Sequence, residues 1–175
     1  IESGIKTAAP DADVVCLPMA DGGEGTVDAV FRAAGGKMER VAVEGPLGAA
    51  TTAEFCLINN GATAVMEMAS ASGIELVPAA SLNPMLASTY GTGQMIKAAL
   101  GMGVREIIIG IGGSATVDGG AGMAQALGLR LSDGSGAELA RGGGPLANLK
   151  HADASGMDGR LREVSFRVAC DVTNP

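Results

Sequence analysis

The feature that most constrains the fold is a loop of 13 residues with six glycines, at residues 110–122. The apolar run before it, residues 105–109, predicts a buried strand of the parallel type, and the residues after it predict a helix that ends near Leu127. Open α/β sheets bind ligands where strands of this kind end. The sequence therefore predicts an α/β fold with this loop at a ligand site.

Glycines in this loop would let consecutive backbone amides converge on an anion, and the dipole of the following helix would add partial positive charge. Such an arrangement suits a phosphate group. A tight turn alone needs one or two glycines, whereas this loop holds six. The residues predicted to bind phosphate or nucleotide are Gly112, Gly113, Ser114, Ala115, Thr116, Gly119 and Gly120.

A dinucleotide-binding loop is the competing interpretation of the same residues. Gly110-x-Gly112-x-x-Ala115 matches the dinucleotide fingerprint, and Asp133 lies roughly where an acid would bind the ribose, which would indicate an NAD-dependent oxidoreductase. In that fold the helix begins inside the fingerprint, so three further glycines would fall within a helix at about 1 kcal/mol each relative to alanine. Phosphate binding is favoured for that reason. A non-catalytic module that binds a phosphorylated metabolite also stays open.

A second glycine-rich loop, Asp21-Gly22-Gly23-Glu24-Gly25-Thr26, follows a predicted strand at residues 13–17 and precedes a predicted helix at 26–34. Asp21 and Glu24 could hold Mg²⁺, which prefers oxygen ligands. Carboxylates near a helix N-terminus also stabilise the helix itself. The chemistry of the residues does not separate these two roles.

Two aspartates are candidates for a general base that accepts the proton of a substrate hydroxyl. Asp171 follows the strand predicted at residues 164–170, and Asp118 lies in the long glycine-rich loop. Each could instead form a turn. Phosphoryl transfer depends mostly on positioning and on charge neutralisation, so a base with an ordinary pKa would suffice.

Hydroxyl groups gather at the start of a helix predicted at residues 91–102, and in the small polar segment 67–73. They could bind a polyhydroxy acid, although Ser88 or Thr89 could equally cap the helix. The candidate substrate-binding residues are Ser88, Thr89, Thr92 and Ser70.

The composition limits the partners of the protein. The net charge of −7 disfavours nucleic acid and anionic lipid, and no apolar run reaches the roughly 18 residues of a membrane span. Cys16, Cys56 and Cys170 each stand in an apolar run, so we expect buried thiols in a reducing compartment. These features predict a cytoplasmic protein.

Three segments together resemble the bacterial glycerate kinase family of the glycerate 2-kinase type. They are residues 21–26 (DGGEGT), 110–122 (GIGGSATVDGGAG) and 169–175 (ACDVTNP), and their order and spacing fit as well. Residues 67–73 (EMASASG) and 89–93 (TYGTG) also fit the family.

The resemblance implies ATP-dependent phosphorylation of D-glycerate, with Mg²⁺ and with 2-phosphoglycerate as the favoured product. It also implies two unlike α/β domains with mixed sheets, whose glycine-rich loops meet at the interdomain cleft. On that basis we expect residues 1–62 to be part of a Rossmann-like first domain and residues 63–175 to be part of a second α/β domain. A homodimer is an open alternative to a monomer.

The sequence departs from the family pattern in two ways. Val117 stands where the family has Asn, which removes a polar group from the long loop. The family's opening strand with its Ala-Pro-Asp-Ser-Phe-Lys segment is missing, as is a C-terminal half. We therefore expect a fragment that has no kinase activity of its own.

Overall fold

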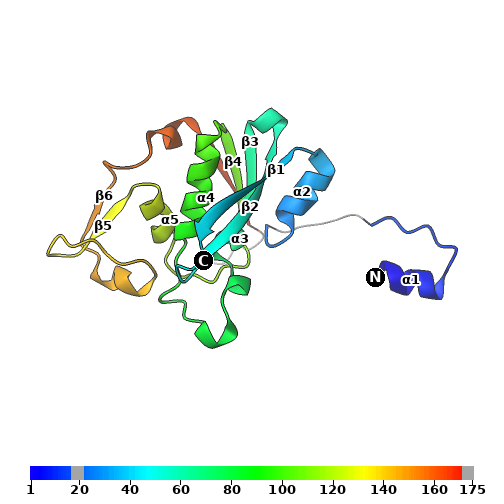
Figure 1. The fold of residues 1–175 in the computed structure, drawn as a ribbon, viewed down its shortest axis with the longest axis horizontal. Coiled ribbons are helices and arrows are strands. Elements are labelled where there is room, and N and C mark those ends of the chain that lie inside the picture. Colours follow the sequence, from blue (N-terminus) through cyan, green and yellow to red (C-terminus); the bar gives the residue numbers. More distant parts are fainter. Residues whose placement is uncertain (17–21, 171–175) are drawn as a thin grey trace.

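The structure is a computed structural model that describes residues 1–16 and 22–170. Its centre is a mixed sheet of five strands in the order β1-β2-β3-β4-β7 (Figure 1). β1, β2 and β3 pair as antiparallel neighbours, whereas β3, β4 and β7 run parallel. The strands are β1 Lys37–Glu44, β2 Ala50–Ile58, β3 Thr63–Glu67, β4 Glu106–Gly110 and β7 Ser165–Ala169. The expected mixed α/β fold is confirmed.

Helices cover both faces of this sheet. α2 (Thr26–Ala34) packs on one face through Val27, while α4 (Tyr90–Gly101) and the short α3 (Ala69–Ser72) pack on the other. α5 (Ala121–Ala126) packs against α4.

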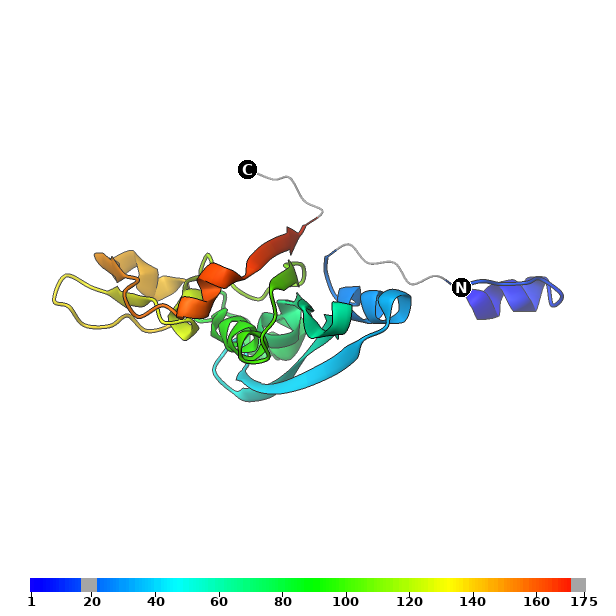
Figure 2. The ribbon, with the colours of Figure 1, turned by 90° about the horizontal axis from the view of Figure 1, so that it is seen from above.

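The remaining elements are short or lie away from the main sheet. β5 (Arg130–Ser132) and β6 (His151–Asp153) form a small second sheet. α1 (Glu2–Ala8) has no buried residue and lies apart from the other helices in Figures 1 and 2. Five 3₁₀ segments connect the larger elements of the described chain: Asn59–Gly61, Ile74–Leu76, Ala79–Ser81, Gly144–Asn148 and Gly159–Glu163.

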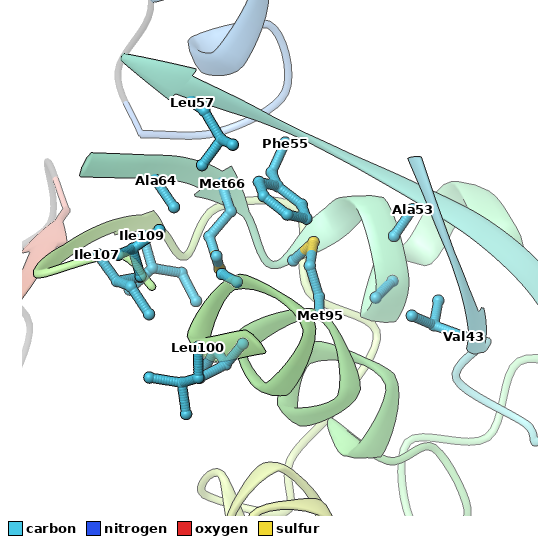
Figure 3. Close-up of a cluster of buried hydrophobic side chains, with 14 of the residues drawn as sticks. Val43, Ala53, Phe55, Leu57, Ala64, Met66, Met95, Leu100, Ile107 and Ile109 are labelled. Atoms are coloured by element: carbon cyan, nitrogen blue, oxygen red, sulfur yellow. The ribbon is translucent and has the colours of Figure 1, made fainter. Parts of the chain in front are cut away.

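The main core lies between the sheet and α4, and Figure 3 shows its side chains. Strand register aligns two apolar rows across the sheet, one through Leu57, Ala64 and Ile107 and one through Phe55, Met66 and Ile109. Each residue of both rows is at most 9% exposed. Aliphatic and methionine side chains fill most of this core because aromatic residues make up only 2% of the chain.

The two rows continue onto β7 but lose their cover there. Phe166 pairs with Ile107 and Val168 pairs with Ile109, so both lie on the α4 side of the sheet. Phe166 is nevertheless 42% exposed and Val168 is 60% exposed. Parallel strands are usually covered on both faces, whereas this strand is partly uncovered on its α4 side.

Most elements predicted from the sequence are present within one or two residues of their expected bounds. The strand predicted at 13–17 is wrong for its described part, because residues 13–16 form no strand and Val15 is 75% exposed. A strand without a pairing neighbour leaves its amides and carbonyls unpaired, so a local apolar run is not enough. The predicted burial of Cys16 and Cys170 is also wrong, since both are exposed, whereas Cys56 is buried.

The expected domain boundary between residues 62 and 63 falls inside the main sheet. β2 and β3 pair directly across it, with Ile58 opposite Thr63. Strands from both ranges therefore share one sheet in this structure. The division of the longer protein into two domains stays a prediction.

Candidate active site

A cleft of about 890 Å³ lies beside the N-terminus of α2, where β3 ends. We call it the α2 cleft. Three residues predicted to have site roles line it: Glu24, Ser70 and Gly113. They come from different parts of the chain, because the end of β3, the loop after β4 and the start of α2 meet here. This is the edge at which open α/β sheets bind their ligands.

Glu67 also lines the α2 cleft, and the candidate residues chosen from the sequence did not include it. It is the last residue of β3 and is 8% exposed. Its Oε1 accepts a hydrogen bond of 2.7 Å from the amide of Val27, in the first turn of α2. The sequence feature that could have identified Glu67 is its place as the one charged residue of β3, at the end of the strand.

The surroundings of Glu67 shift its acidity. Burial raises the pKa of the Glu67 carboxyl, and the nearby charge of Glu24 raises it further. The amides of Val27, Gly25 and Thr26 act in the opposite direction because they stabilise the charged form. Two carboxylates therefore lie near each other at one end of the α2 cleft.

Ser70 is held in place by the sheet. Its Oγ accepts a hydrogen bond of 2.8 Å from the amide of Glu54 in β2. The side chain remains part of the cleft lining. A hydroxyl that already accepts one bond can still donate its proton to a ligand.

Asp118 is surrounded by donors from its own chain. It is 1% exposed, and its Oδ2 accepts hydrogen bonds from the amides of Thr89 (2.9 Å) and Gly122 (3.1 Å). Its Oδ1 accepts from the amide of Gly120 (3.2 Å), and the hydroxyl of Thr89 lies 3.0–3.1 Å from both oxygens. The Ser88 hydroxyl is a longer contact of 3.4 Å. This arrangement favours a positioning role that joins the starts of α4 and α5.

Several amides of the long glycine-rich loop are bonded within the protein. The amide of Gly112 donates to the carbonyl of Gly22 (3.2 Å), and the amide of Ala115 donates to the carbonyl of Ser72 (3.0 Å). The amide of Thr116 donates to the Ser114 hydroxyl (3.0 Å). These amides, like those bonded to Asp118, do not point together at a shared ligand.

Close packing of backbone explains several glycines of both loops. A Cβ on Gly110 would overlap the carbonyl oxygen of Gly22, and a Cβ on Gly112 would lie 2.7 Å from the Cα of Gly23. The two glycine-rich loops therefore touch backbone to backbone. Positive φ accounts for others, since Gly120 has a φ of 82° directly before α5.

The remaining candidate residues lie outside the α2 cleft. Ser114, Ala115 and Thr116 line a separate, mostly apolar pocket of about 240 Å³. Thr92 is fully buried, and its hydroxyl forms a hydrogen bond of 2.8 Å with the Ser72 hydroxyl.

Gly119 has a φ of 57° in the turn before α5. Two further groups complete the placement of the predicted residues. Ser88 borders a third pocket of about 480 Å³, beside Arg141, which stacks on the ring of Tyr90 and pairs with Glu44. Asp21 and Asp171 lie outside the described residues.

The residues near the start of α2 offer one of the carboxylate ligands that a Mg²⁺ ion needs, at Glu24. Among the described residues no group of three or more His, Cys, Asp or Glu side chains could hold a metal ion. Mg²⁺ commonly takes one or two carboxylates and completes its coordination with water and substrate phosphates, so Glu24 at the α2 cleft fits such a site. None of the helices within residues 1–16 and 22–170 has the length and apolarity needed to cross a bilayer.

Fold and cleft together define an α/β protein with a candidate ligand site where its parallel strands end. The family described as "Glycerate kinase family" matches residues 1–175. The chain therefore belongs to the glycerate kinase family.

Individual relatives agree with this assignment. The chain is 54% identical over 175 residues to a glycerate kinase of Bacillus subtilis and 52% identical over 175 residues to a glycerate 2-kinase of Escherichia coli. All of this chain is matched in both, but only 46% of each relative. A crystal structure described as glycerate kinase 2 from Salmonella typhimurium LT2 matches with a TM-score of 0.87 and 52% identity, covering 99% of this chain and 47% of that one. The chain thus spans about half the length of its relatives.

Proposed function

We propose that the longer protein to which this chain corresponds phosphorylates D-glycerate with ATP. The observation that carries the proposal is the match of the entire chain to the glycerate kinase family, at 52–54% identity to relatives with that name. The NAD-dependent alternative has no support, because α5 begins at Ala121, six residues beyond the fingerprint. Asp133 instead organises an exposed turn through Ser135.

Three residues of the α2 cleft have proposed roles in this reaction. Glu24 would hold Mg²⁺, which when bound would offset the negative charge of the triphosphate. Ser70 would donate a hydrogen bond to glycerate, and the backbone around Gly113 would face the phosphates.

Asp171 is the proposed general base, because the burial of Asp118 favours a positioning role. The base would take the proton of the attacking hydroxyl while the new oxygen–phosphorus bond forms. The bond between the γ-phosphorus and ADP breaks in the same step.

The proposed product is 2-phosphoglycerate. Its support is the name of the Escherichia coli relative, glycerate 2-kinase, which is 52% identical to this chain. We further propose a cytoplasmic enzyme with two α/β domains, and no turnover by the 175-residue chain alone, since it spans only 46% of its relatives.

The test is an assay of the purified longer protein with ATP, Mg²⁺ and D-glycerate. We expect release of ADP that depends on all three, and a phosphorus NMR signal of 2-phosphoglycerate. L-glycerate and NAD serve as controls. No ADP release, or binding of NAD without binding of ATP, would refute the proposal.

Two matched substitutions test the roles of the aspartates. Asp171→Asn should lower kcat about 10²–10⁴-fold if Asp171 is the base. Asp118→Asn should lower stability more clearly than kcat. If Asp118→Asn lowered kcat more than Asp171→Asn, Asp118 would be the base instead.

A further inference from the structure

Glu67 occupies a junction between the sheet and the glycine-rich loop that carries Glu24. Its backbone belongs to β3 and lies opposite Gly110 of β4, whereas its carboxylate accepts from the Val27 amide of α2 at 2.7 Å. The side chain therefore ties the first turn of α2 to the end of the sheet.

The other end of the same loop is held by β4. A hydrogen bond of 3.2 Å joins the Gly112 amide to the Gly22 carbonyl, and the contact between Gly110 and Gly22 is too close for a side chain. Residues 22–27 are thus fixed at two points, the loop after β4 on one side and Glu67 on the other. Glu24 stands between these two points and lines the α2 cleft.

We propose that Glu67 is a positioning residue that sets where the Glu24 carboxylate lies in the α2 cleft, through its hydrogen bond to Val27. This inference rests on the proposed function for the role of Glu24, but not for the structural link itself. Residues that orient a metal ligand from behind typically change metal affinity or activity by 10–100-fold when they are lost.

Three substitutions separate the hydrogen bond from the charge. Glu67→Gln keeps the length and an acceptor oxygen but removes the charge. Glu67→Asp keeps the charge but is one methylene shorter and cannot reach the Val27 amide without backbone movement. Glu67→Ala removes both. A role through the hydrogen bond predicts that Gln preserves function better than Asp or Ala.

The matched control is Asp158→Asn, which alters a capping carboxylate at a distant 3₁₀ segment. Asp158 caps residues 159–163 by accepting from the Arg160 amide at 3.1 Å, and it does not border the α2 cleft. This substitution removes the charge but keeps an acceptor oxygen for the cap, so it should leave both the loop around Glu24 and the kinetics unchanged.

The experiment measures amide hydrogen exchange and Mg²⁺ dependence in the longer protein. In Glu67→Ala and Glu67→Asp, exchange at residues 25–27 should rise about tenfold, as expected for loss of a buried hydrogen bond to a carboxylate. The Mg²⁺ concentration for half-maximal activity should rise about 10–100-fold, whereas Glu67→Gln should stay near the wild type in both.

Each contrary result has one meaning. Unchanged exchange at residues 25–27 in Glu67→Ala and Glu67→Asp, an equal rise in Asp158→Asn, or an unchanged Mg²⁺ requirement despite faster exchange would overturn the positioning role. If Glu67→Ala does not fold, the comparison of Gln with Asp decides the question. A wild type that releases no ADP would refute the proposed function, while the exchange data would still decide whether Glu67 holds the loop.

Discussion

Asp118 and Glu67 are both buried carboxylates that accept hydrogen bonds from amides at the start of a helix, yet their surroundings differ. Asp118 is enclosed by donors from residues 88–89 and 120–122 and joins α4 to α5. Glu67 accepts a hydrogen bond of 2.7 Å from the Val27 amide and borders the α2 cleft. A fully satisfied carboxylate stabilises a junction, whereas one at the edge of a cleft can also shape what the cleft binds.

The largest expected effect is on the Asp118 junction. Asp118→Ala should lower the free energy of unfolding by about 3 kcal/mol, because the amides of Thr89, Gly120 and Gly122 lose a charged acceptor in a buried place. Urea unfolding followed by circular dichroism measures this. Asp118→Asn, which keeps one acceptor oxygen, should cost less. If Asp118→Ala lowered the free energy of unfolding by less than about 1 kcal/mol, Asp118 would not stabilise its junction as its many hydrogen bonds predict, and its difference from Glu67 would disappear.

Packing at the same junction gives a second test. Gly122→Ala would place a Cβ in conflict with the Ser88 hydroxyl and 2.8 Å from the Tyr90 amide, so we expect a loss of about 2 kcal/mol. Gly159→Ala is the control, since a Cβ there meets no atom within 4 Å. Thermal unfolding of the two variants should differ by several degrees. Equal melting temperatures of Gly122→Ala and Gly159→Ala would show that the backbone at this junction can shift to accept the extra methyl group.

The acidity of Glu67 predicts a dependence of stability on pH. A carboxyl whose pKa is raised by folding binds more protons in the native state than in the unfolded state, so stability falls as pH rises from the ordinary value of 4.5 through the raised one. A single group changes the free energy of unfolding by at most about 1.4 kcal/mol per pH unit. Glu67→Gln should lack this contribution in urea titrations across that range. A wild type and variant with parallel pH profiles would contradict the prediction.

The smallest effect on stability is expected at the ion pair of Glu44 with Arg141, which is partly exposed and lies outside the α2 cleft. Glu44 pairs with Arg141, which also stacks on Tyr90, and both charged side chains are about one-third exposed. Arg141→Ala should cost about 1 kcal/mol, part of it removable by salt. Arg141→Lys should recover only some of the loss. If Arg141→Ala lowered the free energy of unfolding more than Asp118→Ala, the expectation that more deeply buried groups contribute more would be wrong.

Much of the fold followed from local sequence pattern. The apolar runs at residues 105–109 and 164–170 predicted two strands of the main sheet, and the helices predicted at 26–34 and 91–102 are present as α2 and α4. The strand predicted at residues 13–17 is absent from its described part, residues 13–16, because pairing depends on a neighbouring strand that the local sequence does not reveal. β6 was missed for a similar reason, since its three exposed residues have no apolar pattern.

The candidate site was harder to predict from residue types alone. Clustered glycines indicate close backbone approach, but the approaching group can be a phosphate or, as at Gly110 and Gly112, another loop of the same protein. An aspartate in such a loop can be a base, and it can also be buried among backbone donors, as Asp118 is. Glu67 gave almost no local signal, because its role arises from a contact 40 residues away in the sequence.

The open side of β7 has a consequence for handling this polypeptide. Among the described residues β7 is the last strand of the main sheet, so no strand there pairs with its outer edge, and Phe166 and Val168 are exposed beside that edge. A strand of this kind is a template on which a second molecule can add its own strand. Solutions of the 175-residue chain should therefore self-associate through β7 as concentration rises, and Val168→Lys should delay that association.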